Sequence, residues 1–458
     1  MTRSRMVVVG GDAAGMSAAH QALRSAQQHG RELEVTVLEA TEDTSYSACG
    51  IPYWISGEVD SRRSLIARTP EVHRQLGVDL RTGARATHVD HDAGEVHWVG
   101  PDGEQRLGYD DLVIATGAPS IVPDWARDAS GAPGRGVQVV KTLDDGAWWI
   151  RALAGAPKHV VVAGGSYIGL EMAEAMLAHG HRVTLMTRSR VMSNLDEPMS
   201  DRVATALDVG GVTVHTGAAA SGVERAADGS LAAVLAGDLR VEADLLVLAI
   251  GVTPATEIVQ HLDLPRSRRG ALRPDPHGRL ADGLWAAGDC CDVRHRITGD
   301  WAYLPLGTHA NKMGRATGDT IGGGDLTFPG ALGTAITRFA AGAAYAEIAR
   351  TGLGLVEAQE AGFKAVEVTT DGTTASGYHP DAQPIALSVV GEQGTGRLLG
   401  AQLVGGRGSA KRIDTVAMAL WSGSSVADLA WADLAYAPPF ATAWEFVSLA
   451  ARRLAERL

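Results

Sequence analysis

Met6-Val-Val-Val-Gly-Gly-Asp-Ala-Ala-Gly15 is the stretch that decides the fold of this chain. Its apolar residues predict a buried strand, and the glycines after them allow a tight turn into a helix over residues 16–26. A second strand follows over residues 34–38. This strand–helix–strand design binds dinucleotides, because the helix N-terminus faces the pyrophosphate and an acid after the second strand takes the ribose hydroxyls. The residues that we predict to bind the dinucleotide here are Gly10, Gly15 and Glu39.

The same unit occurs a second time. His159-Val-Val-Val-Ala-Gly-Gly-Ser-Tyr-Ile-Gly169 is again an apolar strand with a glycine turn, and a helix-like run and a returning strand over residues 183–186 follow it. One glycine motif is weak evidence, and the first copy has Asp12 at the place of the middle glycine. Two complete copies predict two dinucleotide sites, one for a flavin and one for a nicotinamide cofactor. In the second copy, the predicted cofactor-binding residues are Gly164, Gly169 and Glu171.

The two copies differ after their second strand. The first ends in the acid Glu39, whereas the second continues as Met186-Thr-Arg-Ser-Arg190 and has no acid at the matching place. An arginine there can pair with the 2'-phosphate that distinguishes NADP from NAD. We therefore predict that Arg188 binds the cofactor and that NADPH is preferred, with NADH possible. The alternative is that Arg188 is an ordinary surface charge.

Cys49 lies in the run Ser45-Tyr-Ser-Ala-Cys-Gly-Ile-Pro-Tyr53, shortly after the first unit. A thiol placed there can lie against a flavin ring and exchange electrons with it. No second cysteine is close, so its disulfide partner comes from outside, or Cys49 cycles through another oxidation state. Because the thiolate is the reactive form, we expect a lowered pKa for Cys49. The alternative is an inert, buried cysteine.

The composition of the chain argues against several classes of protein. The 458 residues are enough for two to four domains, and a net charge of −12 argues against nonspecific nucleic-acid binding. The N-terminus runs straight into a strand with no signal-peptide core, and no apolar stretch is long enough to span a bilayer. The three cysteines form no disulfide framework or metal pattern. We expect a cytoplasmic protein that binds neither membrane nor nucleic acid.

Further segments resemble one superfamily. Asp111–Gly117, Leu245–Pro254 and Gly283–Asp289 are apolar strands that end in glycine turns, and Leu304–Arg315 looks like a flavin-facing helix. In this order they resemble the pyridine nucleotide-disulfide oxidoreductase superfamily, from about residue 5 to about residue 450. The resemblance implies that Asp289 bonds the ribityl chain of FAD. The residues that it adds to the cofactor sites are Ala115, Thr116, Gly117, Gly251, Asp289, Leu306 and Ala310.

Within the superfamily, the run around Cys49 and the segment Tyr436-Ala-Pro-Pro-Phe440 resemble the single-cysteine branch. That branch holds coenzyme A-disulfide reductases, persulfide reductases, and NADH oxidases or peroxidases. The resemblance implies that Cys49 takes the flavin-proximal place. It also implies that Tyr436 reaches from a partner subunit as a hydroxyl donor; the alternative is a turn that packs at an interface. Oxidases of the branch usually carry a histidine at the position of Ala13, so the alanine favours disulfide or persulfide reduction.

The thiol substrate stays open. Gln21 and Arg24 keep the polar helix face that coenzyme A reductases use, and we add Ser45 to the predicted substrate site. Two departures from the family pattern count against coenzyme A. Ala48 stands directly before the cysteine, where the family commonly has asparagine. Tyr378 is followed by histidine, where the reductase relatives have a second tyrosine. A small disulfide, such as coenzyme A disulfide, or a persulfide is therefore the predicted substrate class.

These observations predict an α/β protein with two Rossmann-like domains and a C-terminal α+β dimerisation domain. We assign residues 1–118 and 252–328 to the FAD domain, 119–251 to the NAD(P) domain and 329–458 to the dimerisation domain, so a homodimer is expected. The predicted activity passes electrons from NADPH, or NADH, through FAD and Cys49 to the disulfide. The alternatives are an NAD(P)H oxidase that reduces oxygen to water or peroxide, and a reductase of a small electron-carrier protein.

Overall fold

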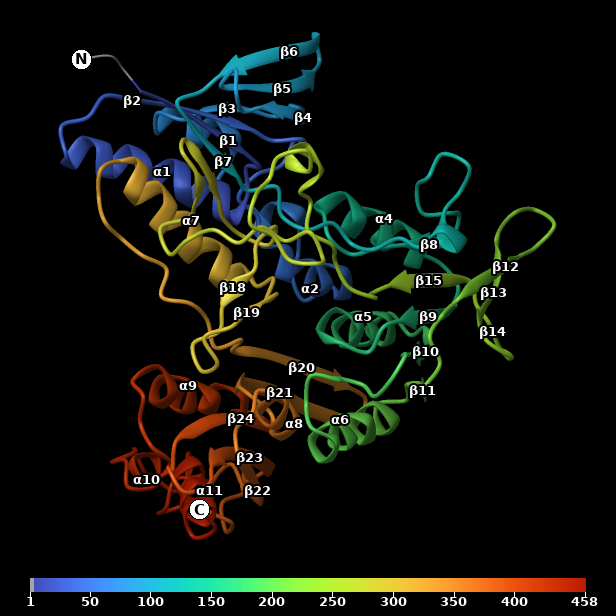
Figure 1. Cartoon of the computed structure of the whole chain (residues 1–458). Coiled ribbons are helices and arrows are strands. Elements are labelled where there is room, and N and C mark those ends of the chain that lie inside the picture. The colour runs from blue at the N-terminus through green and yellow to red at the C-terminus, as the bar shows by residue number, and fades with distance from the viewer. Residues whose placement is uncertain (1–3) are drawn as a thin grey trace.

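The computed structural model describes residues 4–458 and contains three sheets of five or six strands, with helices around them (Figure 1). The first sheet has the strand order β16-β17-β7-β1-β2-β3. Neighbouring strands are parallel from β17 to β3, and β16 pairs antiparallel with β17. Its strands are β1 (Ser4–Val9), β2 (Leu33–Leu38), β3 (Asp79–Arg81), β7 (Asp111–Ile114), β16 (Arg279–Ala281) and β17 (Leu284–Ala286).

The second sheet repeats this design. All of its strand pairs are parallel, in the order β11-β10-β9-β15-β8. Most residues of its central strands are buried, because helices cover one face and a small antiparallel sheet over residues 222–242 packs on the other, which explains their continuous Val and Leu runs. The elements are β8 (Val137–Gln138), α4 (Leu143–Leu153), β9 (His159–Ala163), α5 (Tyr167–Ala178), β10 (Arg182–Met186), α6 (Glu197–Val209), β11 (Thr213–His215) and β15 (Leu245–Leu248).

Helices α1 (Ala13–Gln28) and α7 (Gly307–Ile321) pack against each other unusually closely. A Cβ atom on Gly314 would lie 2.1 Å from the backbone oxygen of Ala14, and one on Gly318 would lie 2.1 Å from that of Ala18. Small residues on both helices let the backbones approach. The sequence-predicted helices over 16–26 and 304–315 are therefore one helix pair beside the first sheet (Figure 1).

Two connections join the first and second sheets, and they run side by side. Ile121 donates its backbone N–H to the oxygen of Gly251 over 3.0 Å, and Thr253 donates to the oxygen of Pro119 over 3.0 Å. Ser120 and Val252 form an antiparallel bridge between them. The chain thus leaves the first unit and re-enters it at adjacent points.

The third sheet is antiparallel and has the order β20-β21-β24-β23-β22. Helix α11 packs on β22 and β23 and buries Phe446, so that the sheet and its helices share one apolar core. The elements are β20 (Ala335–Ala341), β21 (Ala344–Gly352), α8 (Leu355–Glu360), β22 (Ala365–Thr373), β23 (Pro384–Glu392), β24 (Leu398–Gly405), α9 (Ile413–Trp421), α10 (Val426–Ala430) and α11 (Phe446–Ala455).

The remaining elements are short. Two three-stranded antiparallel sheets and one two-stranded ribbon extend from the larger units. Their strands are β4 (Arg85–Asp90), β5 (Glu95–Gly100), β6 (Gly103–Gly108), β12 (Gly222–Arg225), β13 (Leu231–Ala236), β14 (Leu239–Glu242), β18 (Val293–Arg294) and β19 (Trp301–Ala302). The short helices are η1 (Ala48–Gly50), α2 (Ile51–Ser56), η2 (Arg62–Leu65), α3 (Pro70–Gln75), η3 (Asp124–Ala126), η4 (Glu257–Val259) and η5 (Ala410–Arg412).

The parallel sheets and the separate C-terminal sheet confirm the predicted α/β class with two Rossmann-like units. The exact domain boundaries stay predictions, and the first of them begins in residues that lie outside the described range. Among residues 4–458, no helix is both long enough and apolar enough to cross a membrane.

Candidate active site

The first glycine turn brings three predicted residues together. Gly10 has a φ of +107°, and a Cβ atom there would lie 2.1 Å from the backbone oxygen of Ala115. A Cβ on Gly15 would lie 1.8 Å from the oxygen of Gly10. Only glycine fits these two places, because the turn is pressed between β7 and the start of α1. The result is a smooth backbone cradle at the N-terminus of α1.

Glu39 closes the far side of this cradle. Its Oε2 accepts the backbone N–H of Gly11 over 2.7 Å, and its Oε1 accepts the N–H of Thr41 over 2.8 Å. The carboxylate keeps further lone pairs for ribose hydroxyls. Asp12, at the usual glycine position, has its pKa raised to about 6 by burial and by the charge of Glu39. A largely neutral Asp12 at pH 5 lowers the negative charge beside the place of the pyrophosphate.

Asp289 lies on the other side of the cradle, after β17. Lys141 Nζ lies 3.7 Å from its Oδ2, and Tyr303 donates its hydroxyl to the Asp289 backbone oxygen over 3.0 Å. Gly288 approaches both α1 and α7, since a Cβ on it would lie 2.8 Å from the Cβ of Ala14 and 3.7 Å from that of Ala310. Thus Asp289 and Ala310 converge on the first glycine turn.

The other predicted flavin residues lie at the two side-by-side connections or at the end of α7. Thr116 donates its hydroxyl to the backbone oxygen of Ala255, and Gly117 accepts from the N–H of Ala255 over 3.0 Å. Gly251, at φ +112°, is on the neighbouring connection, and Leu306 is the N-cap of α7. The glycine cradle, the acid at its rim and Asp289 fit an FAD molecule. When bound, FAD supplies two-electron chemistry, taking hydride from a nicotinamide and passing electrons to sulfur.

The second glycine turn has the same geometry as the first. Gly164 has a φ of +114°, and a Cβ on it would lie 2.1 Å from the oxygen of Ala249. A Cβ on Gly169 would lie 2.0 Å from the oxygen of Gly164. Two repeated cradles, in two parallel sheets, fit two dinucleotides. The predicted Gly164 and Gly169 lie together at the N-terminus of α5.

Arg188 lies just beyond β10, beside this second cradle. Its side chain is exposed and makes no hydrogen bond or ion pair with any residue of the described chain. Arg190, two residues later, is half-buried and donates to the Leu195 oxygen over 3.2 Å. Of the two arginines, Arg188 is therefore the one that is free to meet a phosphate.

Cys49 lies in η1, at the start of α2, and is exposed. Neighbouring protein nevertheless crowds the thiol, so that desolvation raises its pKa; the charge of Glu171 raises it further, and Lys141 lowers it. The expected lowered pKa is therefore wrong for the protein by itself, because a nearby carboxylate and loss of water outweigh a single lysine. The structure brings Cys49, Glu171 and Lys141 into one electrostatic environment between the two cradles.

Glu171 is the most strongly perturbed group of this environment. Burial raises the pKa of Glu171 from the ordinary 4.5 to about 7. A hydrogen bond of 2.9 Å, which the hydroxyl of Thr337 donates to the carboxylate, partly opposes this rise. Thr337 belongs to β20 of the third sheet. The C-terminal unit thus contributes a residue to the surroundings of Cys49.

This raised pKa gives a stability prediction. Between pH 4.5 and pH 7 the folded chain holds a proton on Glu171 that the unfolded chain has released, so the free energy of unfolding falls as pH rises. Glu171→Gln removes this loss of stability. Because Glu171 keeps some contact with solvent, we expect the free energy of unfolding of the variant to exceed that of the parent by only about 1–2 kcal/mol at pH 8. Urea unfolding at pH 5 and pH 8 measures it. An equal difference at both pH values would contradict the prediction, and Thr337→Val should enlarge the pH dependence of the parent.

A cavity of about 710 Å³ opens beside the segment that precedes Cys49. Gln21, Arg24 and Ser45, the three predicted substrate residues, all line it. Gln21 is buried and donates to Ser25 Oγ over 3.0 Å and to Asp319 Oδ1 over 3.1 Å, so its amide N–H groups are held within the α1–α7 pair. Arg24 is exposed and faces the cavity.

The structure adds cations that the sequence did not place there. Lys312 and Arg315 of α7 and Arg68 from the loop before α3 line the same cavity with Arg24. All four are exposed, and none makes an ion pair within residues 4–458. The spacing of Lys312 and Arg315, three residues apart on a helix, was a signal that both share one face. With these four cations against one acid, Asp12, the lining of the cavity attracts anionic groups.

Tyr436 does not meet Cys49 within one chain. It lies between α10 and α11, at the C-terminal end of the third unit, whereas α2 lies between the first and second units (Figure 1). Its side chain is 49% exposed, and Tyr378, Phe440 and Trp431 nearby in the same unit are 73–79% exposed. The backbone N–H of Ser376 binds the oxygen of Pro438 over 2.9 Å, which joins the Tyr378 loop to the Tyr436 segment.

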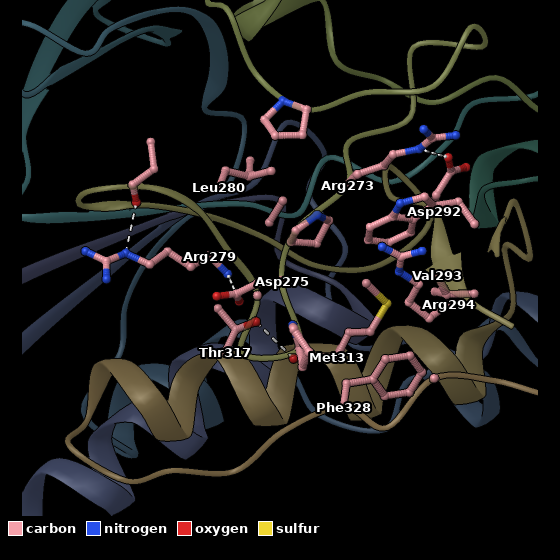
Figure 2. Close-up of a pocket in the computed structure, with 18 of the residues that line it drawn as sticks. Arg273, Asp275, Arg279, Leu280, Asp292, Val293, Arg294, Met313, Thr317 and Phe328 are labelled. Atoms are coloured by element: carbon pink, nitrogen blue, oxygen red, sulfur yellow. Dashed lines mark hydrogen bonds and ion pairs between the residues drawn. The ribbon is translucent and has the colours of Figure 1, made fainter. Parts of the chain in front are cut away.

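A second cavity, of about 670 Å³, lies beside Met313 and Thr317 of α7, and none of the predicted residues lines it. Figure 2 shows Arg273 extended toward Asp292, with Arg294 beside them above Met313 of α7. Arg273 bonds Asp292 over 2.9 Å, and Arg294 donates to the oxygen of Gly299 over 2.9 Å. Its arginines are thus satisfied by the protein itself.

The comparisons with known proteins agree with this geometry. The family model for pyridine nucleotide-disulphide oxidoreductases matches residues 4–314, and the model for the dimerisation domain of these enzymes matches residues 343–446. The chain therefore belongs to the pyridine nucleotide-disulphide oxidoreductase family, as its motifs predicted. It is an FAD-dependent NAD(P)H oxidoreductase.

Particular relatives lie within the predicted branch. The NAD(P)H coenzyme A polysulfide/persulfide reductase of Pyrococcus horikoshii is 35% identical over 460 residues, which cover 99% of this chain and 98% of the relative. The NAD-dependent persulfide reductase of A. fulgidus matches with a TM-score of 0.91 and 32% identity, over 99% of this chain and 83% of that one. The water-forming NADH oxidase of Lactobacillus brevis, bound to NADH, matches with a TM-score of 0.91 and 26% identity over 99% and 98%, and so does an engineered NADPH-bound variant of it.

Proposed function

We propose that this enzyme uses NADPH, through FAD and Cys49, to reduce the disulfide or persulfide of a small, phosphate-bearing thiol. The observation that carries the proposal is an exposed thiol between two dinucleotide cradles, next to a cavity with four unpaired cationic side chains. The relative from Pyrococcus horikoshii is named a coenzyme A polysulfide/persulfide reductase and the one from A. fulgidus a persulfide reductase, which supports a substrate of the same chemistry.

Different residues of the chain bind the cofactors and carry out the sulfur chemistry. The glycine cradles and Glu39 would hold FAD and NADPH, which would supply the electrons for sulfur reduction. The Cys49 thiolate attacks one sulfur of the substrate disulfide, so that a mixed disulfide forms and the other sulfur leaves with the electron pair. Overall, one NADPH, one proton and one disulfide give NADP⁺ and two thiols. Lys141 favours the thiolate form of Cys49, and Glu171 responds to pH beside it.

The cationic cavity selects the substrate. Phosphate groups bind arginine through paired hydrogen bonds and lysine through charge, so Arg24, Arg68, Lys312 and Arg315 suit a thiol with several phosphates. Coenzyme A is such a thiol. Since the whole chain carries a charge of −12, this local excess of positive charge stands out against its surroundings.

NADPH rather than NADH is the proposed electron donor. The engineered NADPH-bound relative has five printed substitutions, three of them at adjacent positions that give Ala-Arg-Ser. This chain has Thr187, Arg188 and Ser189 directly after β10. The similarity supports Arg188 as the residue that meets the 2'-phosphate.

Arg188→Glu should therefore invert the cofactor preference. Loss of a charge-assisted bond to phosphate, with a repulsive charge in its place, lowers kcat/KM for NADPH by about 10²-fold and leaves NADH little changed. Steady-state kinetics with both cofactors measures this ratio. Arg151→Glu, an exposed charge change on α4, is the matched control, and an unchanged NADPH/NADH ratio in Arg188→Glu would show that Arg188 is a surface charge only.

The proposal includes a homodimer in the cytoplasm, with domains bounded as the sequence predicts. The exposed aromatic side chains around Tyr436 and Tyr378 are suited to burial against a second copy. In that dimer we propose that Tyr436 of one subunit serves the Cys49 site of the other as a hydroxyl donor. The matched dimerisation-domain model supports the assembly.

NADPH consumption by the FAD-loaded protein without oxygen, with and without coenzyme A disulfide, tests the function. Consumption that depends strongly on the disulfide is the expected result. The likeness to a water-forming oxidase makes oxygen reduction the second candidate. Rapid consumption that needs air and not disulfide would establish that alternative and overturn the proposal.

A further inference from the structure

Three polar side chains at the wall of the cationic cavity form a continuous hydrogen-bonded chain. His73 Nε2 lies 3.0 Å from Ser45 Oγ, and His73 Nδ1 lies 2.7 Å from His20 Nε2. The three residues come from α3, from the segment before Cys49 and from α1, and all three line the cavity. Both ring nitrogens of His73 are therefore used, one toward Ser45 and one toward His20.

Burial and charge keep this chain neutral. His73 has no solvent exposure, and burial, His20 and Arg68 lower its pKa to about 4. Burial, Arg68 and Arg24 also lower the pKa of His20, which is half-buried. Lys312 and Arg315 of α7 face the same cavity, and no carboxylate bonds either ring within residues 4–458. Each neutral ring then has one donor and one acceptor nitrogen, as a proton relay requires.

Ser45 is held in place at a cost in backbone conformation. Its φ is +50°, in the left-handed region that residues other than glycine seldom adopt, which costs on the order of 1 kcal/mol. Its backbone oxygen accepts the N–H of Ala67 over 2.9 Å, and its hydroxyl meets His73. Cys49 follows four residues later. The segment thus fixes a hydroxyl at the wall of the cavity, four residues before the thiol.

We propose that Ser45, His73 and His20 deliver a proton to the thiolate that leaves when Cys49 attacks the substrate; this rests on the proposed function. As the substrate S–S bond breaks, the leaving sulfur takes the proton of the Ser45 hydroxyl. Ser45 Oγ takes a proton from His73 Nε2, and His73 Nδ1 takes one from His20 Nε2. His20 Nδ1 takes a proton from water in the cavity. Ser45 meets the substrate, whereas His73 and His20 act through Ser45.

The relay matters most for substrates whose thiolates are basic. An alkyl thiol such as coenzyme A is a weaker acid than the cysteine side chain, whose pKa is about 8.5, so it leaves better when it is protonated. An aromatic nitrothiol is a weak base and leaves as an anion without help. Comparing substrates with these two leaving groups therefore distinguishes an effect on proton delivery from an effect on any other step.

The test compares these two substrates in His20→Gly, His73→Phe and Ser45→Ala, with His91→Gln as control. His91 bonds the Tyr109 hydroxyl over 3.1 Å, away from the cavity. With coenzyme A disulfide we expect kcat to fall by about 10–100-fold in the three relay variants. With dithiobis(nitrobenzoate) it should stay within about twofold. Imidazole added to His20→Gly should restore the lost rate, which a structural role of His20 would not explain.

Each other outcome has a definite meaning. If the parent enzyme reduces neither disulfide, the proposed function is wrong and the relay is rejected with it. If the parent reduces both and the relay variants match it, the relay alone is rejected. Equal losses on both substrates without rescue by imidazole would show that these residues only support the fold, and if His73→Phe fails to fold, His20→Gly decides the question.

Discussion

Cys49→Ser is expected to lower disulfide-dependent NADPH turnover by about 10³-fold or more while the protein still binds FAD. A serine hydroxyl neither ionises near neutral pH nor forms a mixed disulfide. Electrons from NADPH therefore cannot pass to the substrate disulfide. The exposed position of Cys49 means that the replacement leaves the core intact. Flavin bleaching by NADPH, followed by absorbance without oxygen, should remain.

Cys291→Ala is the matched control. Cys291 is buried and its Sγ lies 3.7 Å from that of Cys290, with both thiols free. Its loss should reduce stability by about 1–2 kcal/mol and leave disulfide reduction in place. Retained turnover in Cys49→Ser would show that electrons leave the enzyme by another route, as in an oxidase or a reductase of a carrier protein.

Gly10→Ala is the second variant with a large expected effect. The added Cβ would lie 2.1 Å from the Ala115 oxygen and 2.7 Å from the Ala115 carbon, and both are backbone atoms that cannot turn aside. With a φ of +107° as well, the change should destabilise the protein by about 3–5 kcal/mol. The cradle would open, and FAD would be lost on purification. The flavin-to-protein absorbance ratio and thermal unfolding measure both effects.

Gly30→Ala separates crowding from backbone strain. Gly30 lies after the C-terminal end of α1, the helix that Gly10 precedes, and has a φ of +65°. No atom lies within 4 Å of the position that a Cβ atom on Gly30 would take. Its replacement should cost about 1–2 kcal/mol and leave the flavin bound. If Gly10→Ala retained FAD as Gly30→Ala does, the close approach at Ala115 would not be needed for cofactor binding.

Local patterns were enough to predict the two cradles. Gly10 and Gly15, like Gly164 and Gly169, are spaced as a strand–turn–helix unit requires, and that geometry depends on a few consecutive residues. Cys49 was predicted to be the reactive thiol from its place after the first unit. These predictions needed no knowledge of which distant segments meet.

Contacts between distant segments were beyond the reach of such patterns. His20 and His73 are 53 residues apart, and Thr337 reaches Glu171 across 166 residues. The pKa of Cys49 was mispredicted for the same reason, since the desolvation of its thiol and the charge of Glu171 both depend on how the units pack. Tyr436 stays a prediction, because its proposed place lies in a second subunit.

The paired connections at Ser120 and Val252 have a practical consequence for protein engineering. Because the chain exits and returns at neighbouring points, the second parallel sheet is an insertion whose two ends are already held together. Such an insertion is exchangeable as a cassette, since replacing it alters no other connection of the host. A cassette from an NADH-using relative would then carry its cofactor preference into this enzyme, with the thiol and the cationic cavity left in place.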